Sequence, residues 1–163
     1  MTKSDKSKHN ICVASIKRST MNPYDFKWTK FYDCNSDLQY TYPELQLDLV
    51  ENELFICSTI IDIDNYSILT TQRLITKEKG IENVGNLTGA TDKLYGDFIG
   101  HKGDSFTFGL VQLIRGADMK YFIETGKASM IMIHGVRTLI GTQQMTNSQI
   151  GKGTRILDKQ NEK

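Results

Sequence analysis

The chain has 163 residues, of which 39% are hydrophobic and 24% charged, and its formal net charge at pH 7 is +1. This length and composition predict one globular domain that buries a core without needing disulfides or metals. A net charge near zero provides no overall field to attract nucleic acid or an anionic membrane, so we expect no nucleic-acid partner.

Residues 1–43 are predicted to be a polar N-terminus and an aromatic segment that packs on the core. Residues 1–10 are polar and rich in lysine, and we expect them to be mobile. A helix would place Trp28, Phe31 and Tyr32 on one face, together with Tyr24. Phe26 and Trp28, however, alternate with polar residues as they would in a strand. We favour a short helix within residues 22–42, ending before the proline at position 43.

Strand patterns dominate from residue 45 onward. Leucines at 45, 47 and 49 alternate with polar residues, which predicts a half-buried strand. Residues 53–63 and 66–76 are two runs rich in β-branched and aromatic residues. Asp64 and Asn65 lie between them and tolerate the left-handed backbone of a tight turn, so the two runs are predicted to form a β-hairpin.

The next segments are predicted to alternate between turns and strands. Residues 80–93 are rich in turn residues and are expected to form a loop, and residues 94–99 a short strand. In residues 105–114 the apolar positions change parity, which predicts a strand with a bulge near Gly109. Residues 116–118 then form a second hairpin turn, and residues 119–124 complete that hairpin.

The last predicted element is a helix over residues 127–140. Its apolar residues Met132, Ile133, Val136 and Ile140 recur at helical spacing, and Gly141 suits the C-terminal end. Residues 146–163 are expected to be a polar tail.

Successive antiparallel strands followed by one helix predict an α+β fold, in which an antiparallel barrel or strongly bent sheet is closed by a C-terminal helix. The run Tyr66-Ser-Ile-Leu-Thr-Thr-Gln-Arg-Leu-Ile75, followed by a charged turn ending at Gly80, resembles a strand of the bacterial pleckstrin-homology-like (PH-like) family. The resemblance covers residues 44–142, and we place the domain at residues 44–145. It implies a binding or membrane-proximal module without a shared catalytic site.

Common ligand sites are not predicted by the sequence. The loop at residues 62–65 is acidic and would repel a phosphate head group, so no phosphoinositide binding is expected. As a calcium loop starting at Asp62 it has Ser67 and Arg73 where glycine and glutamate are required. The histidines are far apart in sequence and lack partners at metal-ligand spacing. We therefore expect no cofactor and no metal.

The sequence predicts a non-enzymatic cytoplasmic binding module. Its N-terminus lacks the pattern of a secretory signal, and its three cysteines are widely separated. The partner is expected to be a protein or a second copy of the chain, bound through an exposed apolar patch or an unpaired sheet edge. The candidate contact residues are Trp28, Phe31, Tyr32 and Arg73, although Arg73 also fits a solvent-facing strand position with its stem packed on neighbours.

Two other functions stay open at this point. A small immunity or accessory protein that neutralises a toxin would carry a charged face on one side. An enzyme of unrecognised type would need convergent groups in a cleft, for instance His101, His134 and Cys57. For Cys57, which is flanked by isoleucines, an inert buried thiol is the favoured interpretation.

Overall fold

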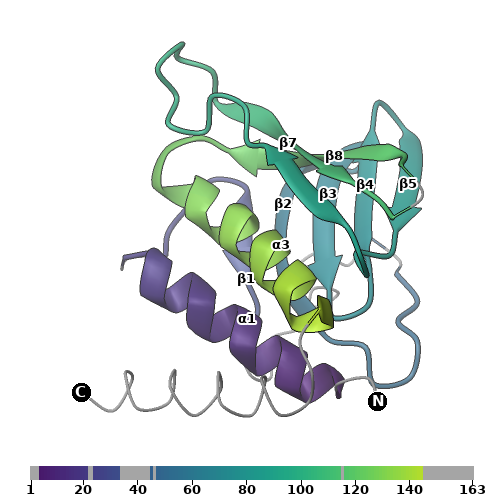
Figure 1. The fold of residues 1–163 in the computed structure, drawn as a ribbon. Coiled ribbons are helices and arrows are strands. Elements are labelled where there is room, and N and C mark those ends of the chain that lie inside the picture. The colour runs from purple at the N-terminus through teal and green to yellow at the C-terminus, as the bar shows by residue number, and fades with distance from the viewer. Residues whose placement is uncertain (1–3, 22–23, 34–44, 46, 115, 145–163) are drawn as a thin grey trace.

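The computed structural model describes residues 4–21, 24–33, 45, 47–114 and 116–144 (Figure 1). Within those residues the chain forms helices at both ends and strands between them. The elements are α1 (Asp5–Ser19), β1 (Thr29–Phe31), β2 (Phe55–Asp62), β3 (Asn65–Thr70), β4 (Leu74–Glu78), β5 (Ile81–Gly85), β6 (Thr91–Leu94), β7 (Phe106–Gln112), β8 (Asp118–Glu124), the 3-10 helix η1 (Gly126–Ala128) and α3 (Ser129–Gln144).

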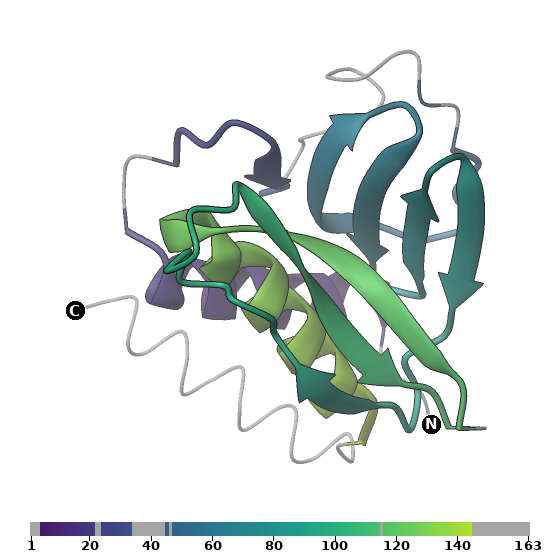
Figure 2. The same ribbon diagram turned by 90° about the horizontal axis from the view of Figure 1, so that it is seen from above.

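The strands form two antiparallel sheets. The larger sheet has the order β1-β2-β3-β4-β5 and the smaller sheet the order β6-β7-β8. Strand β8 crosses the strands of the larger sheet, and the backbone N–H of Phe122 donates a hydrogen bond of 2.7 Å to the Ser67 hydroxyl there (Figures 1 and 2). The predicted α+β class is thus confirmed, while the described strands form two separate sheets rather than a closed barrel.

Each face of the larger sheet covers a hydrophobic core. Along β3, Ser67 and Leu69 face the smaller sheet and α3, whereas Tyr66 and Ile68 face the opposite side, as the period of two requires. Helix α3 packs on the first face, and α1 packs against α3 (Figure 1). The Thr138 hydroxyl of α3 donates to the Ser15 hydroxyl of α1 over 2.9 Å.

The sequence-based prediction of mobile residues 1–10 is wrong for residues 5–10, which belong to α1. The hydroxyl of Ser4 accepts the backbone N–H of Ser7 and caps the helix, and Asp5 lies in the first turn. The buried face of this helix holds His9, whose ring Nε2 lies 2.7 Å from the backbone oxygen of Tyr32. The polar composition of residues 5–10 gave no sign of a helix, because all of these side chains except His9 lie outside its buried face.

The predicted helix within residues 22–42 is also wrong where the structure describes it. Residues 29–31 form strand β1, which pairs with β2 from Thr29↔Thr59 to Phe31↔Cys57. The carboxylate of Glu124 accepts the backbone N–H of Trp28 and the hydroxyl of Thr29, each over 2.8 Å. These long-range hydrogen bonds outweigh a weak local helical pattern. Residues 34–42 lie outside the described part.

Two predicted strands need correction. Residues 47–49 are not part of a sheet, and Leu45 is buried while Leu49 is exposed. The run at residues 66–76 is two strands, β3 and β4, because the chain reverses at residues 71–73. The hydroxyl of Thr70 accepts the backbone N–H groups of Gln72 and Arg73, each over 3.1 Å. Such a threonine-centred turn leaves little trace in a strand-forming sequence.

The predicted loop at residues 80–93 contains β5 and the start of β6, and the predicted strand at 94–99 is confined to Leu94. No bulge interrupts β7, which pairs continuously with β8 from Phe106↔Glu124 to Gln112↔Asp118. Gly109 instead allows a close approach, because a Cβ at this position would lie 2.2 Å from Cζ of Tyr121. The predicted β2–β3 and β7–β8 hairpins and the C-terminal helix are confirmed, and α3 continues through Gly141.

Candidate functional site

The predicted contact residues lie in different environments. Tyr32, directly after β1, is 2% exposed, and its hydroxyl is 2.8 Å from that of Ser58 on β2. Its side chain is therefore part of the core. Trp28 is half-buried; its ring lies 6.2 Å from the ring of Phe106, and the Lys27 ammonium sits 4.8 Å above its centroid. Phe31 is half-buried and lines a pocket. The structure does not gather these side chains with Arg73 into one surface.

Arg73 belongs to a buried network at the β3–β4 turn. Its guanidinium donates to the carboxylate of Glu53 over 3.0 and 3.3 Å, and to the backbone oxygen of Asp48 over 2.9 Å. Glu53, whose side chain is fully buried, also accepts the Thr70 hydroxyl and the backbone N–H of Val50. Arg73 therefore fastens the segment before β2 to the sheet, with its guanidinium directed at internal partners.

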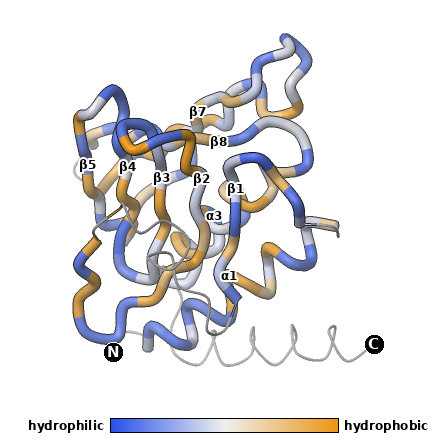
Figure 3. The backbone as a smooth tube through the Cα atoms, turned by 180° about the vertical axis from the view of Figure 1, so that it is seen from behind, coloured by the Kyte–Doolittle hydropathy of each residue, from blue (hydrophilic) through white to orange (hydrophobic). Residues whose placement is uncertain are grey.

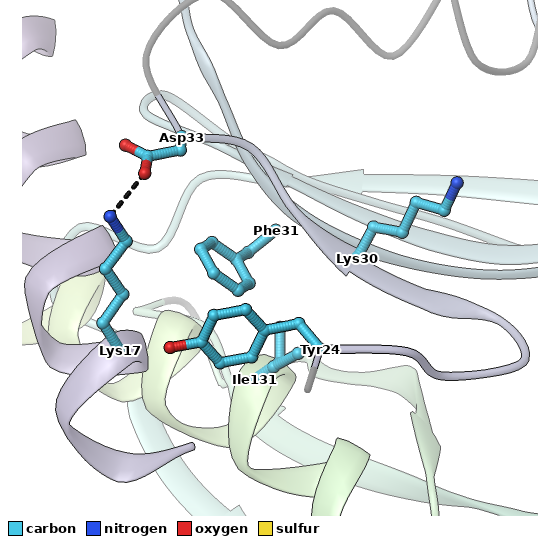
Figure 4. Close-up of a pocket in the computed structure, with 6 residues that line it drawn as sticks. All are labelled: Lys17, Tyr24, Lys30, Phe31, Asp33 and Ile131. Carbon is cyan, nitrogen blue, oxygen red and sulfur yellow. Dashed lines mark hydrogen bonds and ion pairs between the residues drawn. The ribbon is translucent and has the colours of Figure 1, made fainter. Parts of the chain in front are cut away.

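A pocket of about 390 Å³ lies where α1, β1 and α3 meet (Figure 4). The rings of Tyr24 and Phe31 meet edge to face at 4.9 Å, and Ile131 lies at the base. At one end Lys17 forms an ion pair with Asp33. Lys30 also lines the pocket, but its walls are largely apolar, so the pocket suits a single apolar or aromatic side chain.

A larger groove of about 490 Å³ lies between β4–β5 and the β7–β8 hairpin. Its larger apolar side chains are Leu110, Leu113 and Met119, and Asn83 and Val84 of β5 lie at its border. Its charged borders are paired internally. Lys120 bonds Glu78 over 3.2 Å, and the ammonium of Lys93 lies 3.9 Å from Asp118. The groove thus offers apolar contact with little net charge.

Strand β5 is the last strand of the larger sheet (Figure 3). Its residues Asn83 and Val84 line this groove. The turn between β4 and β5 has Lys79 at φ 51° and Gly80 at φ 82°, the backbone of a two-residue hairpin turn. In such a hairpin the residues that flank the turn, Glu78 and Ile81, form a hydrogen-bonded pair, and the direction then alternates. The backbone groups of Glu82 and Val84 therefore point away from β4.

The β5 edge also exposes apolar side chains. Ile81 is 68% exposed and Val84 is 50% exposed. Leu110 of the groove continues along the same face of β7 to Phe108 and Phe106, the latter 37% exposed. The rings of these two phenylalanines are 5.9 Å apart. An apolar strip on β7 thus runs from the groove toward Trp28.

The groups suggested for catalysis do not form a hydrogen-bonded set in the described residues. Cys57 is fully buried under α3, and its thiol faces the backbone oxygen of Ile131 at 3.8 Å. Burial raises the pKa of the Cys57 thiol, which therefore stays protonated. His101 is exposed in a turn, while His134 is half-buried on α3, where burial lowers its pKa. Among the residues that the structure describes, no group of three or more His, Cys, Asp or Glu side chains is arranged to hold a metal.

A second polar cluster lies between β6 and α3. The Tyr95 hydroxyl donates to Asp92 over 2.9 Å, and the Arg137 guanidinium is 3.8 Å from the same carboxylate oxygen. Burial raises the pKa of Asp92 and, with that carboxylate, raises the pKa of Tyr95 to about 12. The other oxygen of Asp92 and the hydroxyl of Tyr121 are buried without a hydrogen-bond partner. Burying polar atoms without a hydrogen-bond partner costs folding free energy.

Comparisons with known proteins returned no match to a family model, to a curated protein or to a solved structure. In the described residues, no helix has the length and apolar character needed to cross a membrane.

Sequence reasoning missed the β5 groove because it treated residues 80–93 as a loop. The available signal was the glycine at position 80 followed by Ile81 and Val84 three residues apart, a spacing that does not fit simple alternation. The other walls of the groove come from residues about 30 positions later in the sequence, on β7 and β8. Their proximity depends on how the two sheets cross.

Proposed function

We propose that the protein is a protein-interaction module that binds an extended segment of a protein partner along β5. The observation that carries this proposal is the outward backbone edge of β5 beside an apolar groove. An added strand would hydrogen-bond to the backbone groups of Glu82 and Val84 and place alternate side chains into the groove.

The groove walls favour a particular kind of segment. Since the charges at its borders are paired, recognition depends on shape and on apolar contact with Leu110, Leu113 and Met119. We therefore expect the bound segment to carry branched or aromatic apolar residues at every second position. Each hydrogen bond adds about 1 kcal/mol and each Å² of buried apolar surface about 25 cal/mol, before the entropy of ordering the segment is subtracted.

We also propose that the fold is a variant of the PH-like arrangement. The support is the order of elements, in which antiparallel strands β2 to β8 are followed directly by α3 across crossed sheets. A PH-like scaffold is compatible with peptide binding and assigns no catalytic residue.

Selection from a displayed library of random peptides tests the proposed function. We expect enriched peptides to show alternating apolar residues, and NMR shifts on titration to centre on β5 and the groove. Val84→Pro removes an outward N–H from the edge of β5 and should weaken binding at least about tenfold, which corresponds to about 1.4 kcal/mol. Ile99→Pro is the matched control, because Ile99 is similarly exposed (58%) but lies in the loop before β7. Equal weakening by both variants, or shifts centred elsewhere, would contradict the proposal.

A further inference from the structure

The exposed edge of β5 can pair antiparallel with the same edge of a second copy without placing like charges opposite each other. Resting on the proposed function, we infer that the added strand is β5 of a second copy of the chain, paired antiparallel about a two-fold axis at Asn83. The two larger sheets would then form one continuous sheet across the dimer.

The direction of the backbone groups supports this register. The outward groups belong to Glu82 and Val84, which flank Asn83 symmetrically. A two-fold axis at Asn83 places Glu82 of one copy opposite Val84 of the second copy. Each of these two pairs exchanges two N–H···O bonds, and the two Asn83 residues form the non-hydrogen-bonded pair between them.

The side chains are compatible with the same register. Glu82 faces an apolar residue rather than a second carboxylate, so no like charges lie opposite each other. Ile81 faces Gly85 of the second copy. At that glycine, Sδ of Met119 and Cδ1 of Leu113 lie 2.7 and 3.2 Å from the position of a Cβ. Ile81, 68% exposed in one copy, would thus approach an apolar wall of the groove.

Two other registers are less favourable. An axis at Glu82 would bring the two carboxylates of that residue directly opposite each other, which is destabilising. A shift by one residue would set outward groups against residues whose N–H and C=O are already bonded to β4. The Asn83 register satisfies the outward groups without either conflict.

Cysteine cross-linking tests this register directly. In a non-hydrogen-bonded antiparallel pair the Cα atoms are about 4.5 Å apart, within the range that a disulfide spans. In a Cys34→Ser background, Asn83→Cys should form a disulfide-linked dimer under mild oxidation. Glu82→Cys is the matched control, since two residues at 82 are diagonal to each other and should cross-link at least about tenfold less. Equal cross-linking, or none at Asn83→Cys, would overturn the inference.

Sedimentation velocity over about 1 to 500 μM provides the second measurement. Wild-type protein should show a concentration-dependent dimer, and Val84→Pro should shift it to monomer. Proline there removes an outward N–H while leaving the β4–β5 hydrogen bonds in place, so circular dichroism should show a folded protein. A dimer that persists in folded Val84→Pro would place the interface elsewhere and overturn the inference.

The two proposals can fail separately. A protein that stays monomeric at all concentrations, yet binds selected peptides in a Val84-dependent way, would refute the second copy as partner and retain the proposed function. Absence of both peptide binding and dimer would refute both.

Discussion

Gly135 in α3 should resist replacement by alanine, although alanine is the better helix former. Within a helix, alanine is normally more stable than glycine by about 1 kcal/mol. At Gly135, however, a Cβ would lie 2.7 Å from the Cys57 sulfur and 3.2 Å from Cδ2 of Leu69. Both neighbours are fully buried, so they have little room to move. Overpacking of this kind costs about 1–3 kcal/mol, and we expect Gly135→Ala to lower the unfolding free energy by about 1–2 kcal/mol.

A double-mutant cycle separates the clash from helix propensity. Cys57→Ala removes the atom that the new methyl group would meet. In that background Gly135→Ala should be neutral or stabilise by up to about 1 kcal/mol, giving a coupling of about 2 kcal/mol. Urea denaturation followed by circular dichroism measures all four proteins. Stabilisation by Gly135→Ala in the wild-type background, or additivity of the two changes, would refute the packing of α3 on β2 described here.

Three further predictions concern buried polar groups. Arg73→Ala should lower the unfolding free energy by about 3 kcal/mol, because the buried carboxylate of Glu53 loses its charged partner. In urea denaturation, the Glu53→Gln/Arg73→Ala double variant should lose less unfolding free energy than the sum of the two single changes. Because burial raises the pKa of Asp92 above its ordinary value of 3.8, the folded protein binds a proton at this carboxylate more tightly than the unfolded chain does. The contribution of Asp92 to the unfolding free energy therefore falls as the pH rises from 3.8 through the raised pKa. Asp92→Asn should abolish that part of the pH dependence in melts between about pH 3 and 7, and an unchanged profile would contradict the assignment. In a Cys34→Ser background, Cys12 and Cys57 should react with a thiol reagent at pH 8 only after urea unfolds the protein, because both thiols are buried and burial raises their pKa. Rapid labelling of the native protein would contradict their burial.

The sequence predicted well those elements whose pattern is local. The β2–β3 hairpin was evident from two β-branched runs and the acidic turn at Asp64, and α3 from its apolar spacing. It failed where a distant residue decides the conformation. Strand β1 is held by Glu124, and the reversal after Thr70 depends on a side-chain hydroxyl with few sequence signals.

The candidate site was predictable in kind but not in position. An exposed apolar patch or an unpaired sheet edge was expected for an interaction module, and among the described residues β5 is the last strand of its sheet and exposes Ile81 and Val84. The groove itself requires β8 to cross the larger sheet near Ser67, which no local pattern specifies. The aromatic residues of the N-terminal segment were predicted to be contact residues because aromatic side chains are common at interfaces, yet Tyr32 is buried in the second core.

The packing of α1 on α3 has a consequence for the order of folding during synthesis. Residues such as Cys12 and Ile16 are buried in the core that also contains Ile131 to Ile140, near the other end of the described chain. While the ribosome makes the intervening strands, this face of α1 lacks the cover that α3 provides, and the contacts between the two helices close a loop of more than a hundred residues. The sheets can pair as they emerge, whereas docking of the first helix has to wait for the last one. Nascent chains that stall before residue 129 therefore expose an apolar helix face, the kind of surface that chaperones bind.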